Sequence, residues 1–540
     1  MGVPGPVVVV GAGPTGLVAA LLLARRGVDV TVLERRAGVH ALPRAVHLDD
    51  ESVRILQAAG VSDGFAAISR PAAGLRLLDA RLRPFAAFHR SSRGVHGWAE
   101  STLFDQPDLE ALLRAHVAAD PRITLREGVD VVRIDPPGGS FSSVGTATAE
   151  PDVAAIGSPS AGPGGGAAAG GDPSPGDSYR VRLATGEQVP ASAVLGCDGA
   201  RSTVRAAIGA RLRALGPSQR WFVVDVRCAT PLPTWGGVDQ VCDPARAATF
   251  LALTGDRYRW EFRMRSGETA SELAAQVPSL ITRWAPGPVE MLRAEEYTFD
   301  AAVADRWSDG RVFLLGDAAH LTPPFIGQGL GAGLRDAHNL AWKLAAVLHD
   351  GAPGSWVDGY RSERAPHATT MIRGALRVGR AMTGGSGAVA ALRRPLVAGT
   401  LRVPAVRRRA EAGLVTRFGP GTLVDRRRDR RDPVGTPCPQ PWPGHDGLLG
   451  DGWALLTSGA PEQPGPEPRE TMPPHAGLPD AGPSDAVQGP VPSELARRAA
   501  DLGARTVATT DPVLLRWLRT GRVRAVLLRP DRIVAASAPV

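Results

Sequence analysis

The residues best placed to do chemistry form a glycine-rich turn near the N-terminus. Gly11, Gly13 and Gly16 make a GxGxxG pattern between an apolar strand pattern and a helical pattern. In such a turn the first glycine allows the bend, the second lets the backbone approach a pyrophosphate, and the third lets helix and strand pack closely. The start of the helix then offers N–H groups and a positive dipole to the phosphates. Glu34 ends the next strand pattern and can accept a hydrogen bond from a ribose hydroxyl.

A second chemical motif lies about 300 residues downstream. The sequence GDAAH occupies 316–320, directly after the apolar run 312–315, and GQG follows at 327–329 before a helical pattern at 333–349. Asp317 can bind a polyol hydroxyl, although a structural Asp cap is the alternative. N–H groups at the helix start would stabilise the negative charge that a reduced flavin develops around N1 and its C2 carbonyl.

A third turn lies between these two motifs. Asp198 and Gly199 follow the strand pattern 193–195. An Asp-Gly pair at a strand end is by itself only a turn. Because three such strand-end turns occur in one chain, the sequence predicts that they share one FAD site.

This set of motifs resembles the group A flavoprotein monooxygenases, the para-hydroxybenzoate hydroxylase-like family. The resemblance covers nearly the whole chain apart from two low-complexity inserts, and its motifs are specific for the family but not for the substrate. The segments most similar to the 3-(3-hydroxyphenyl)propionate hydroxylase branch are 43–45, 49–51, 339–344 and 529–532.

The resemblance implies a set of residues that contact FAD. They are Gly11, Gly13, Pro14, Thr15, Gly16, Glu34, Arg35, Arg44, Gln106, Asp198, Gly199, Gly316, Asp317, Pro324, Gly327, Gln328, Gly329 and Leu330. Asp198 and Gly199 would also serve the nicotinamide donor, NADH or NADPH, which the family binds transiently without a second dinucleotide fold. Arg44 suits a pyrophosphate on independent grounds, because a guanidinium matches phosphate geometry.

One position departs from the family pattern. The family usually has Asn two residues after GQG, beside the isoalloxazine, and here Gly331 occupies that position. We therefore expect one side-chain contact to the flavin to be missing, while backbone N–H groups still support FAD binding.

The implied reaction is hydroxylation of a phenol or hydroxylated heteroaromatic with NAD(P)H and O₂, through a flavin C4a-hydroperoxide, in specialised metabolism or aromatic catabolism. Water must be excluded from such a site. The candidates for the substrate pocket are His47, Trp260, Phe262, Met264, Pro324 and Phe325. Trp260, Phe262 and Met264 fit a hydrophobic core equally well, and His47 also fits an ordinary satisfied histidine. No catalytic base stands out.

Three alternatives differ in chemistry or class. A flavin-dependent halogenase needs a lysine near its substrate and a WxWxIP pattern; the pattern is absent, and Lys343, the one lysine, follows the flavin turn. Baeyer–Villiger oxidation or epoxidation on the same fold stays open, because those reactions differ by pocket geometry. A non-catalytic flavoprotein or Arg-rich binding module is the third, and ligand-dependent NAD(P)H oxidation would eliminate it.

The elements that must position these residues predict an α/β (α+β) multidomain chain. A Rossmann-like FAD-binding domain is expected from 1–72, 106–214 and 301–400, interleaved with an antiparallel-sheet substrate domain from 73–105 and 215–300. A linker at 401–431 and, by the resemblance, a thioredoxin-like domain at 432–540 complete the chain. Two Gly-, Ala- and Pro-rich inserts, 136–178 and 459–490, bury too few apolar groups to order.

Composition limits the remaining function classes. The net charge is +8, and nearly all of the positively charged residues are arginines. Together with the Ala, Gly and Pro content, this suggests a GC-rich, actinomycete-like genome. The Arg-rich runs 407–409 and 426–431 lack a nucleic-acid-binding motif. Four cysteines without metal-ligand spacing, and the absence of a signal peptide or membrane span, predict a cytoplasmic protein without a metal site. A homo-oligomer is compatible with the sequence.

Overall fold

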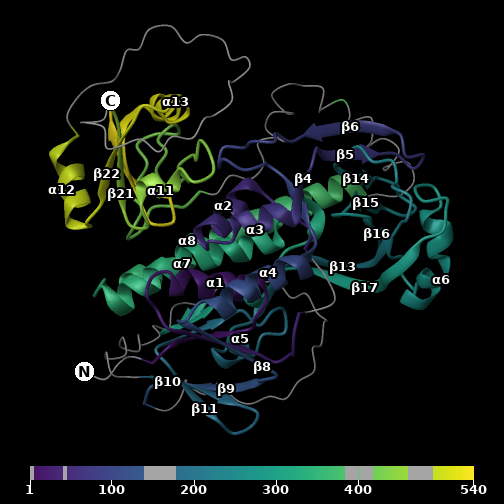
Figure 1. Cartoon of the computed structure of the whole chain (residues 1–540), viewed down its shortest axis with the longest axis horizontal. Helices are drawn as coiled ribbons and strands as arrows, with labels where there is room; N and C mark the ends of the chain where they lie inside the picture. Colours follow the sequence, from purple (N-terminus) through teal and green to yellow (C-terminus); the bar gives the residue numbers. More distant parts are fainter. Residues whose placement is uncertain (1–4, 40–44, 139–177, 384–398, 400–416, 460–490) are drawn as a thin grey trace, which may run out of the picture.

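The computed structural model describes residues 5–39, 45–138, 178–383, 399, 417–459 and 491–540, as two α/β bodies with a large, mostly antiparallel sheet beside the first (Figure 1). Most of the inserts predicted to be disordered fall outside these residues, as does Arg44. No helix among the described residues is long and apolar enough to cross a membrane.

A six-stranded sheet forms the centre of the N-terminal body, in the order β18-β19-β12-β1-β2-β8. Its strands are β1 (Val7–Val10), β2 (Val30–Glu34), β8 (Ile123–Glu127), β12 (Ala193–Gly196), β18 (Ser308–Asp309) and β19 (Val312–Leu314). All pairs are parallel except β18 with β19. The continuous Val7–Val10 run is buried on both faces, as parallel strands between two layers require. Their carboxyl ends, where the motifs follow, therefore lie at one edge.

Helices cover one side of this sheet and a small antiparallel sheet lies on the other (Figure 1). The helices are α1 (Pro14–Ala24), α2 (Asp50–Ala58), α3 (Ser62–Ala67), α4 (Gln106–Ala119), α7 (Gly329–His349) and α8 (Ser355–Thr383). The small sheet contains β9 (Val131–Asp135), β10 (Tyr179–Leu183) and β11 (Gln188–Ala191), with α5 (Thr203–Ala207) beside it. Short helices η1 (Gly316–Ala318) and η2 (Pro324–Ile326) precede α7.

An eight-stranded sheet forms the second layer, in the order β20-β17-β13-β16-β15-β14-β5-β6. Its strands are β5 (Gly74–Leu78), β6 (Pro84–His89), β13 (Leu212–Arg227), β14 (Val238–Val241), β15 (Ala248–Ala252), β16 (Arg257–Arg263), β17 (Glu290–Ala304) and β20 (His320–Leu321). One face packs on α6 (Ala270–Ile281). The other faces a small sheet of β3 (His47–Leu48), β7 (Thr102–Phe104) and β4 (Ser69–Pro71), with Leu103 and Leu251 in one apolar cluster.

The C-terminal body is a four-stranded sheet in the order β22-β21-β23-β24. It comprises β21 (Ala454–Ser458), β22 (Arg505–Thr509), β23 (Val523–Leu528) and β24 (Val534–Pro539), with α11 (Asp446–Leu449), α12 (Ser493–Asp501) and α13 (Pro512–Gly521). β21 and β22 are parallel, while β23 is antiparallel to both β21 and β24.

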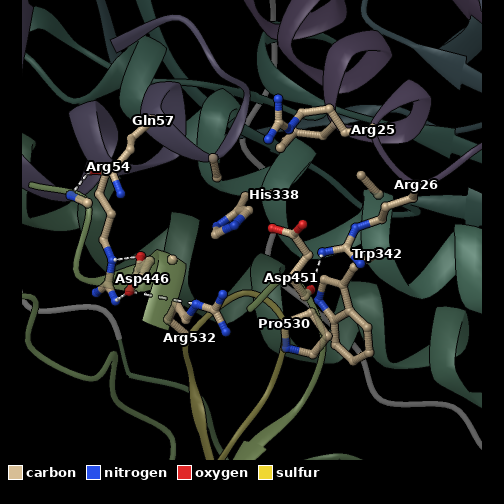
Figure 2. Close-up of a pocket in the computed structure, with 15 residues that line it drawn as sticks. Arg25, Arg26, Arg54, Gln57, His338, Trp342, Asp446, Asp451, Pro530 and Arg532 are labelled. Atoms are coloured by element: carbon tan, nitrogen blue, oxygen red, sulfur yellow. Dashed lines mark hydrogen bonds and ion pairs between the residues drawn. The ribbon is translucent and has the colours of Figure 1, made fainter. Parts of the chain in front are cut away.

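Buried ion pairs join the C-terminal body to the helices. Glu363 on α8 binds Lys343 at 2.8 Å and Arg529 at 2.8 Å, and all three side chains are almost fully buried. Arg54 on α2 binds Asp446 at 2.6 Å. Figure 2 shows Arg54 and Asp446 at the edge of an interdomain cavity of about 260 Å³, with His338 of α7 among its lining residues. Its lining also includes the last turn of α1, so this cavity lies at the opposite end of that helix from the glycine turn.

The expected elements agree with these bounds, with differences at helix ends. The helical pattern expected after GxGxxG is α1, which begins at Pro14 and therefore includes Gly16. The helical pattern at 333–349 corresponds to α7, which begins at Gly329. The antiparallel pairing expected within 215–300 is confirmed for β13 with β16 and β17. Helix α6 was not expected inside the sheet region.

Candidate functional site

The three strand-end turns meet in the structure. A Cβ on Gly11 would lie 2.5 Å from the carbonyl oxygen of Cys197 and 3.0 Å from the Cα of Asp198, so the first and third motifs are in close backbone contact. Thr15, from the first motif, lies against Gly316 of the second: a Cβ on Gly316 would be 3.0 Å from Thr15 Oγ1. The motifs are about 180 and 300 residues apart in sequence, yet they form one edge of one sheet.

Space suited to a cofactor opens at Gly13. A Cβ on Gly13 would meet no atom within 4 Å, whereas one on Gly16 would overlap the carbonyl oxygen of Gly11. Gly16 is therefore required for packing, and Gly13 leaves an open approach to the backbone. No side chain caps α1, its first turn has no acidic residue, and Pro14 lies in the first turn. Uncapped N–H groups and the helix dipole suit a pyrophosphate.

Glu34 holds the glycine turn in shape. Its Oε2 accepts a hydrogen bond from the N–H of Ala12 at 2.7 Å, and its Oε1 accepts one from the N–H of Arg36 at 2.9 Å. The carboxylate is half-buried and each oxygen can accept a further hydrogen bond. Glu34 thus positions the turn and still has acceptor capacity for a ribose hydroxyl. The neighbouring Arg35 is exposed.

Asp317 lies on a turn whose backbone is held by the buried carboxylate of Asp336. Gly316 has φ +58°, and its N–H donates to Asp336 Oδ2 at 3.0 Å. The same carboxylate contacts His320 Nε2 at 2.7 Å and accepts from Arg364 Nε at 2.8 Å. Burial alone would raise the pKa of Asp336, but His320 and Arg364 lower it overall. The carboxylate is therefore ionised and holds the turn in one position.

The GQG segment is held by a contact from His47 of β3. Gly327 adopts φ +60°, and its carbonyl oxygen lies 3.3 Å from His47 Nδ1. His47 Nε2 lies 2.9 Å from Ser101 Oγ. Burial lowers the pKa of His47, so the ring is neutral near pH 7. His47 is thus a satisfied histidine that connects the flavin turn to the segment before β7.

The start of α7 has an uncapped N-terminus, and Arg335 connects it to two acidic residues, Asp49 and Glu51. No side chain caps α7, and its first turn, which includes Gly329 and Leu330, has no acidic residue. Gln328 Oε1 accepts from Arg335 Nη1 at 3.2 Å, and Arg335 also binds Asp49 at 2.6 Å and Glu51 at 2.8 Å. These contacts orient the N–H groups that would meet the flavin.

The departure at Gly331 has a steric reason. A Cβ at Gly331 would lie 2.6 Å from Ser52 Oγ and 2.9 Å from Arg335 Nη1. An Asn in this position would therefore require Ser52 or Arg335 to move. Gly331 fits this chain because Ser52 of α2 and Arg335 of α7 occupy the space that a side chain would need.

The remaining predicted cofactor residues have local roles as well. Asp198 accepts hydrogen bonds from Ser202 Oγ and from the N–H of Val204, and Gly199 has φ +80°. Gln106 Oε1 accepts from the N–H of Ala45 at 2.7 Å, so it anchors the backbone next to Arg44. Arg44 itself is outside the described residues.

The structure divides the pocket candidates between two faces of the large sheet. Trp260, Phe262 and Met264 are buried in the apolar cluster beneath α6, which is the core role that the sequence analysis kept open for them. Phe325 instead contacts Trp221 of β13, with ring centroids 5.9 Å apart. Phe325 and the adjacent Pro324 are half-buried. The face that carries Trp221 is therefore the face toward the flavin turns.

That face carries a charged row that the sequence analysis did not single out. Asp225 accepts two hydrogen bonds from Arg259, at 2.7 and 3.0 Å, and lies 2.7 Å from Arg293. Glu261 lies one row nearer to Trp221, as the cross-strand partner of Val223. The available signal was the alternation Arg259, Trp260, Glu261, which places charge on one face of β16 and apolar groups on the other.

Comparisons with known proteins match this geometry. The family described as "FAD binding domain" matches residues 5–142 and 177–375. The chain is 32% identical over 390 residues to a probable NADH-specific resorcinol 4-hydroxylase of Rhodococcus jostii (strain RHA1), covering 72% of this chain and 67% of that protein. It is 36% identical over 378 residues to a 3-(3-hydroxy-phenyl)propionate/3-hydroxycinnamic acid hydroxylase of Burkholderia cenocepacia (strain HI2424), covering 68% of this chain and 61% of that protein.

A solved structure shares the whole fold. The ternary complex of aklavinone-11 hydroxylase with FAD and aklavinone superposes with a TM-score of 0.70 at 23% identity, covering 99% of this chain and 96% of that one. The chain belongs to the FAD binding domain family. Within that family it is a group A flavoprotein monooxygenase, the class that its motifs predicted.

Proposed function

We propose that this protein hydroxylates a phenolic substrate with FAD, O₂ and NADH or NADPH. The observation that carries the proposal is the meeting of the three turns beside the charged face of the large sheet. Relatives named for resorcinol and hydroxyphenylpropionate support a phenolic substrate. The NADH-specific relative supports NADH as the donor. The aligned regions span 61–67% of these two relatives, so the substrate is inferred from chemistry as well as from likeness.

The residues present fit FAD. The open approach at Gly13 and the uncapped start of α1 would receive the pyrophosphate, and Glu34 a ribose hydroxyl. Asp317 would bind the ribityl chain, and the start of α7 would face the pyrimidine side of the ring. Bound FAD supplies hydride acceptance and O₂ activation, while the protein supplies position and a dry pocket.

Apolar side chains separate the substrate region from water. Trp221 and Val223 are buried on the face toward the flavin turns, and Phe325 packs its ring edge-on against Trp221. Leu103 and Leu251 close the same interface from β7 and β15. A ring of phenol size would lie between these groups and the flavin turns, with its hydroxyl directed to a polar side chain.

The C-terminal body has a supporting role in this proposal. We infer a thioredoxin-like fold from its 2-1-3-4 strand order, with one parallel pair and two antiparallel pairs. Its described residues include one cysteine, Cys438, which is buried, and burial raises the pKa of this thiol to about 12. A thiol with such a pKa is a poor redox group. The four cysteines are free, which supports a reducing cytoplasm.

The test measures NADH and NADPH oxidation by FAD-loaded protein, with H₂O₂ followed in parallel. The panel contains resorcinol, 3-(3-hydroxyphenyl)propionate, 4-nitrophenol, hydroxypyridines, and ketone and alkene probes. Strong stimulation by a phenol with little H₂O₂ is expected. Absence of bound FAD, or no ligand-dependent oxidation with any compound, would refute the monooxygenase. Stimulation by ketones or alkenes alone would keep the cofactor and overturn aromatic hydroxylation.

A further inference from the structure

Glu261 is an acidic residue on a central strand of the large sheet, and like Glu295 on the same face it differs from Asp225 in having no hydrogen-bond or ion-pair partner among the described residues. The structure gives its carboxylate no hydrogen bond and no ion pair among the described residues, although the side chain is half-buried on a central strand. By contrast, Asp225 on the neighbouring strand is tied to Arg259 and Arg293. Burying a carboxylate without a hydrogen-bond partner costs free energy, so such a group indicates that a ligand supplies the missing partner.

The sheet register fixes which way Glu261 points. Val223 is the cross-strand partner of both Glu261 and Glu295, so these side chains share one face. Phe222 and Phe262, one residue along on each strand, point the other way into the cluster beneath α6. The Glu261 face is therefore the face toward the FAD-binding domain.

Three contacts place this face against the FAD-binding domain and the small sheet beside it, and the first of them reaches a flavin turn. Trp221, one row from Glu261, packs on Phe325 of η2. Leu251, the partner of Arg259 on β15, packs with Leu103 of β7. Arg257, on the same face of β16, binds Asp105, the residue before Gln106.

We propose that Glu261 accepts the hydroxyl hydrogen of the phenolic substrate and takes its proton as the ring is oxygenated. This inference rests on the proposed function. The substrate ring would lie beside the contact of Trp221 with Phe325, with its hydroxyl toward β16. Charged groups from each neighbouring element set the environment: Arg259 and Arg263 on β16, Asp225 on β13, and Arg293 and Glu295 on β17.

The proton transfer balances without any further reactant. The O–H bond of the substrate breaks, its proton moves to a carboxylate oxygen of Glu261, and its electron pair increases electron density at the ortho and para carbons. One such carbon takes an oxygen atom derived from O₂, while the second oxygen leaves as water with the electrons of NAD(P)H. The ring carbon then loses its own proton, and the substrate oxygen regains the proton held by Glu261.

The electrostatic surroundings favour this role. Burial raises the pKa of Glu261, Arg259 and Arg293 partly offset that effect, and Asp225 adds to it. A raised pKa makes the carboxylate a stronger proton acceptor than an exposed glutamate, closer to the range in which general bases work near neutral pH. We therefore expect the hydroxylation rate to fall on acidification, over the pH range in which Glu261 becomes protonated.

The experiment compares wild type, Glu261→Gln and Glu261→Asp as FAD-loaded proteins. Binding of resorcinol, 3-(3-hydroxyphenyl)propionate and 4-nitrophenol is followed by the change in flavin absorbance. The tightest binder is then used with carbon-13 at its hydroxyl-bearing carbon, because the chemical shift of that carbon reports ionisation of the bound phenol. Glu296→Gln is the matched control, because Glu296 lies on the same sheet but its carboxylate forms an ion pair with Arg220.

In Glu261→Gln we expect product formation near neutral pH to fall about 10²- to 10⁴-fold. The rate should recover as the pH approaches the pKa of the substrate's own hydroxyl, which is about 10 for a phenol without an electron-withdrawing group. The carbon-13 shift should move toward the neutral phenol, Glu261→Asp should retain part of the rate, and FAD content and the control variant should be unchanged.

Three results would overturn the proposal, and they are distinguishable. If phenols bind and Glu261→Gln hydroxylates within twofold of wild type with the same pH profile and the same carbon-13 shift, Glu261 has no such role and the proposed function stands. If Glu295→Gln, and not Glu261→Gln, produces these effects, the base is Glu295. If none of the three phenols binds to wild type, the proposed function fails and the role of Glu261 falls with it.

Discussion

The carboxylate of Asp336, buried in α7, accepts a hydrogen bond from the backbone N–H of Gly316 at 3.0 Å. This bond connects the interior of a helix to the turn that presents Asp317. His320 and Arg364 contact the same carboxylate at 2.7 and 2.8 Å. The position of a proposed cofactor ligand is thus set by residues that do not reach the cofactor.

Replacing Asp336 tests this relationship. Asp336→Ala leaves the Arg364 guanidinium buried without its counter-charge, so we expect the free energy of unfolding to fall by about 3–5 kcal/mol. Asp336→Asn keeps the shape but weakens the bond to Gly316, and a lost charge-assisted bond costs about 1.5–3 kcal/mol. FAD affinity should then fall roughly tenfold to a hundredfold, as measured by flavin fluorescence titration. The exposed Asp425→Asn is the control, and unchanged FAD affinity in Asp336→Asn would contradict the link.

Two glycines in the first motif should respond in opposite ways. A Cβ on Gly16 overlaps the carbonyl oxygen of Gly11, whereas a Cβ on Gly13 meets nothing within 4 Å. Gly13→Ala should therefore fold with the thermal midpoint of the apoprotein unchanged but lose FAD affinity by tenfold or more. Gly16→Ala should be destabilised by about 1–3 kcal/mol through overpacking. Calorimetry of the apoproteins and FAD titration separate the two effects. A Gly13→Ala protein with full FAD affinity would refute the proposal that the cofactor approaches the backbone at Gly13.

The motifs were predictable because they depend on local rules. The apolar run at 7–10, the glycine spacing after it and the strand before Gly316 each specify a strand and a turn without knowledge of distant residues. The meeting of the turns followed from the rule that carboxyl ends of parallel strands share an edge. Sequence patterns therefore predicted that the three turns come together.

The substrate side depended on contacts that sequence patterns do not contain. The alternation around Trp260 showed that one face of the strand is apolar, but only the position of α6 shows that this face is core. The ion pairs of Asp225 with Arg259 and Arg293 depend on the register of three strands. The unpaired state of Glu261 is visible only once those pairs are known.

The fit between Gly331 and Ser52 can be tested by a double-mutant cycle. Gly331→Ala brings a methyl group to 2.6 Å from Ser52 Oγ, so it should lower the free energy of unfolding by about 1–3 kcal/mol. Ser52→Ala removes that oxygen, and the double variant should recover more than half of the loss. Gly359→Ala in α8 is the control, because its Cβ would meet nothing closer than 3.6 Å. Additive effects of Gly331→Ala and Ser52→Ala in urea unfolding would contradict the contact.

The junction with the C-terminal body should be sensitive to acid because Glu363 has a depressed pKa. Burial alone would raise the pKa of Glu363, but Arg529 and Lys343 lower it to about 2 from an ordinary 4.5. Because the folded pKa lies below the unfolded one, this carboxylate stabilises the protein fully above about pH 4.5. Its contribution, on the order of 3 kcal/mol, is lost as the pH falls from about 4.5 to 2.

Three tryptophans at the junction report its state. Trp342 of α7 and Trp356 of α8 contact Trp453 of the C-terminal body, with ring centroids 5.7 and 6.0 Å from it. Their fluorescence should change between pH 4.5 and 2 in wild type. Glu363→Gln removes the titrating group and unbalances Lys343, so the same change should already be present at pH 7, with a loss of about 3–5 kcal/mol in unfolding free energy. The exposed Glu494→Gln should behave as wild type, and a Glu363→Gln protein with an unaltered acid transition would show that other groups hold the junction.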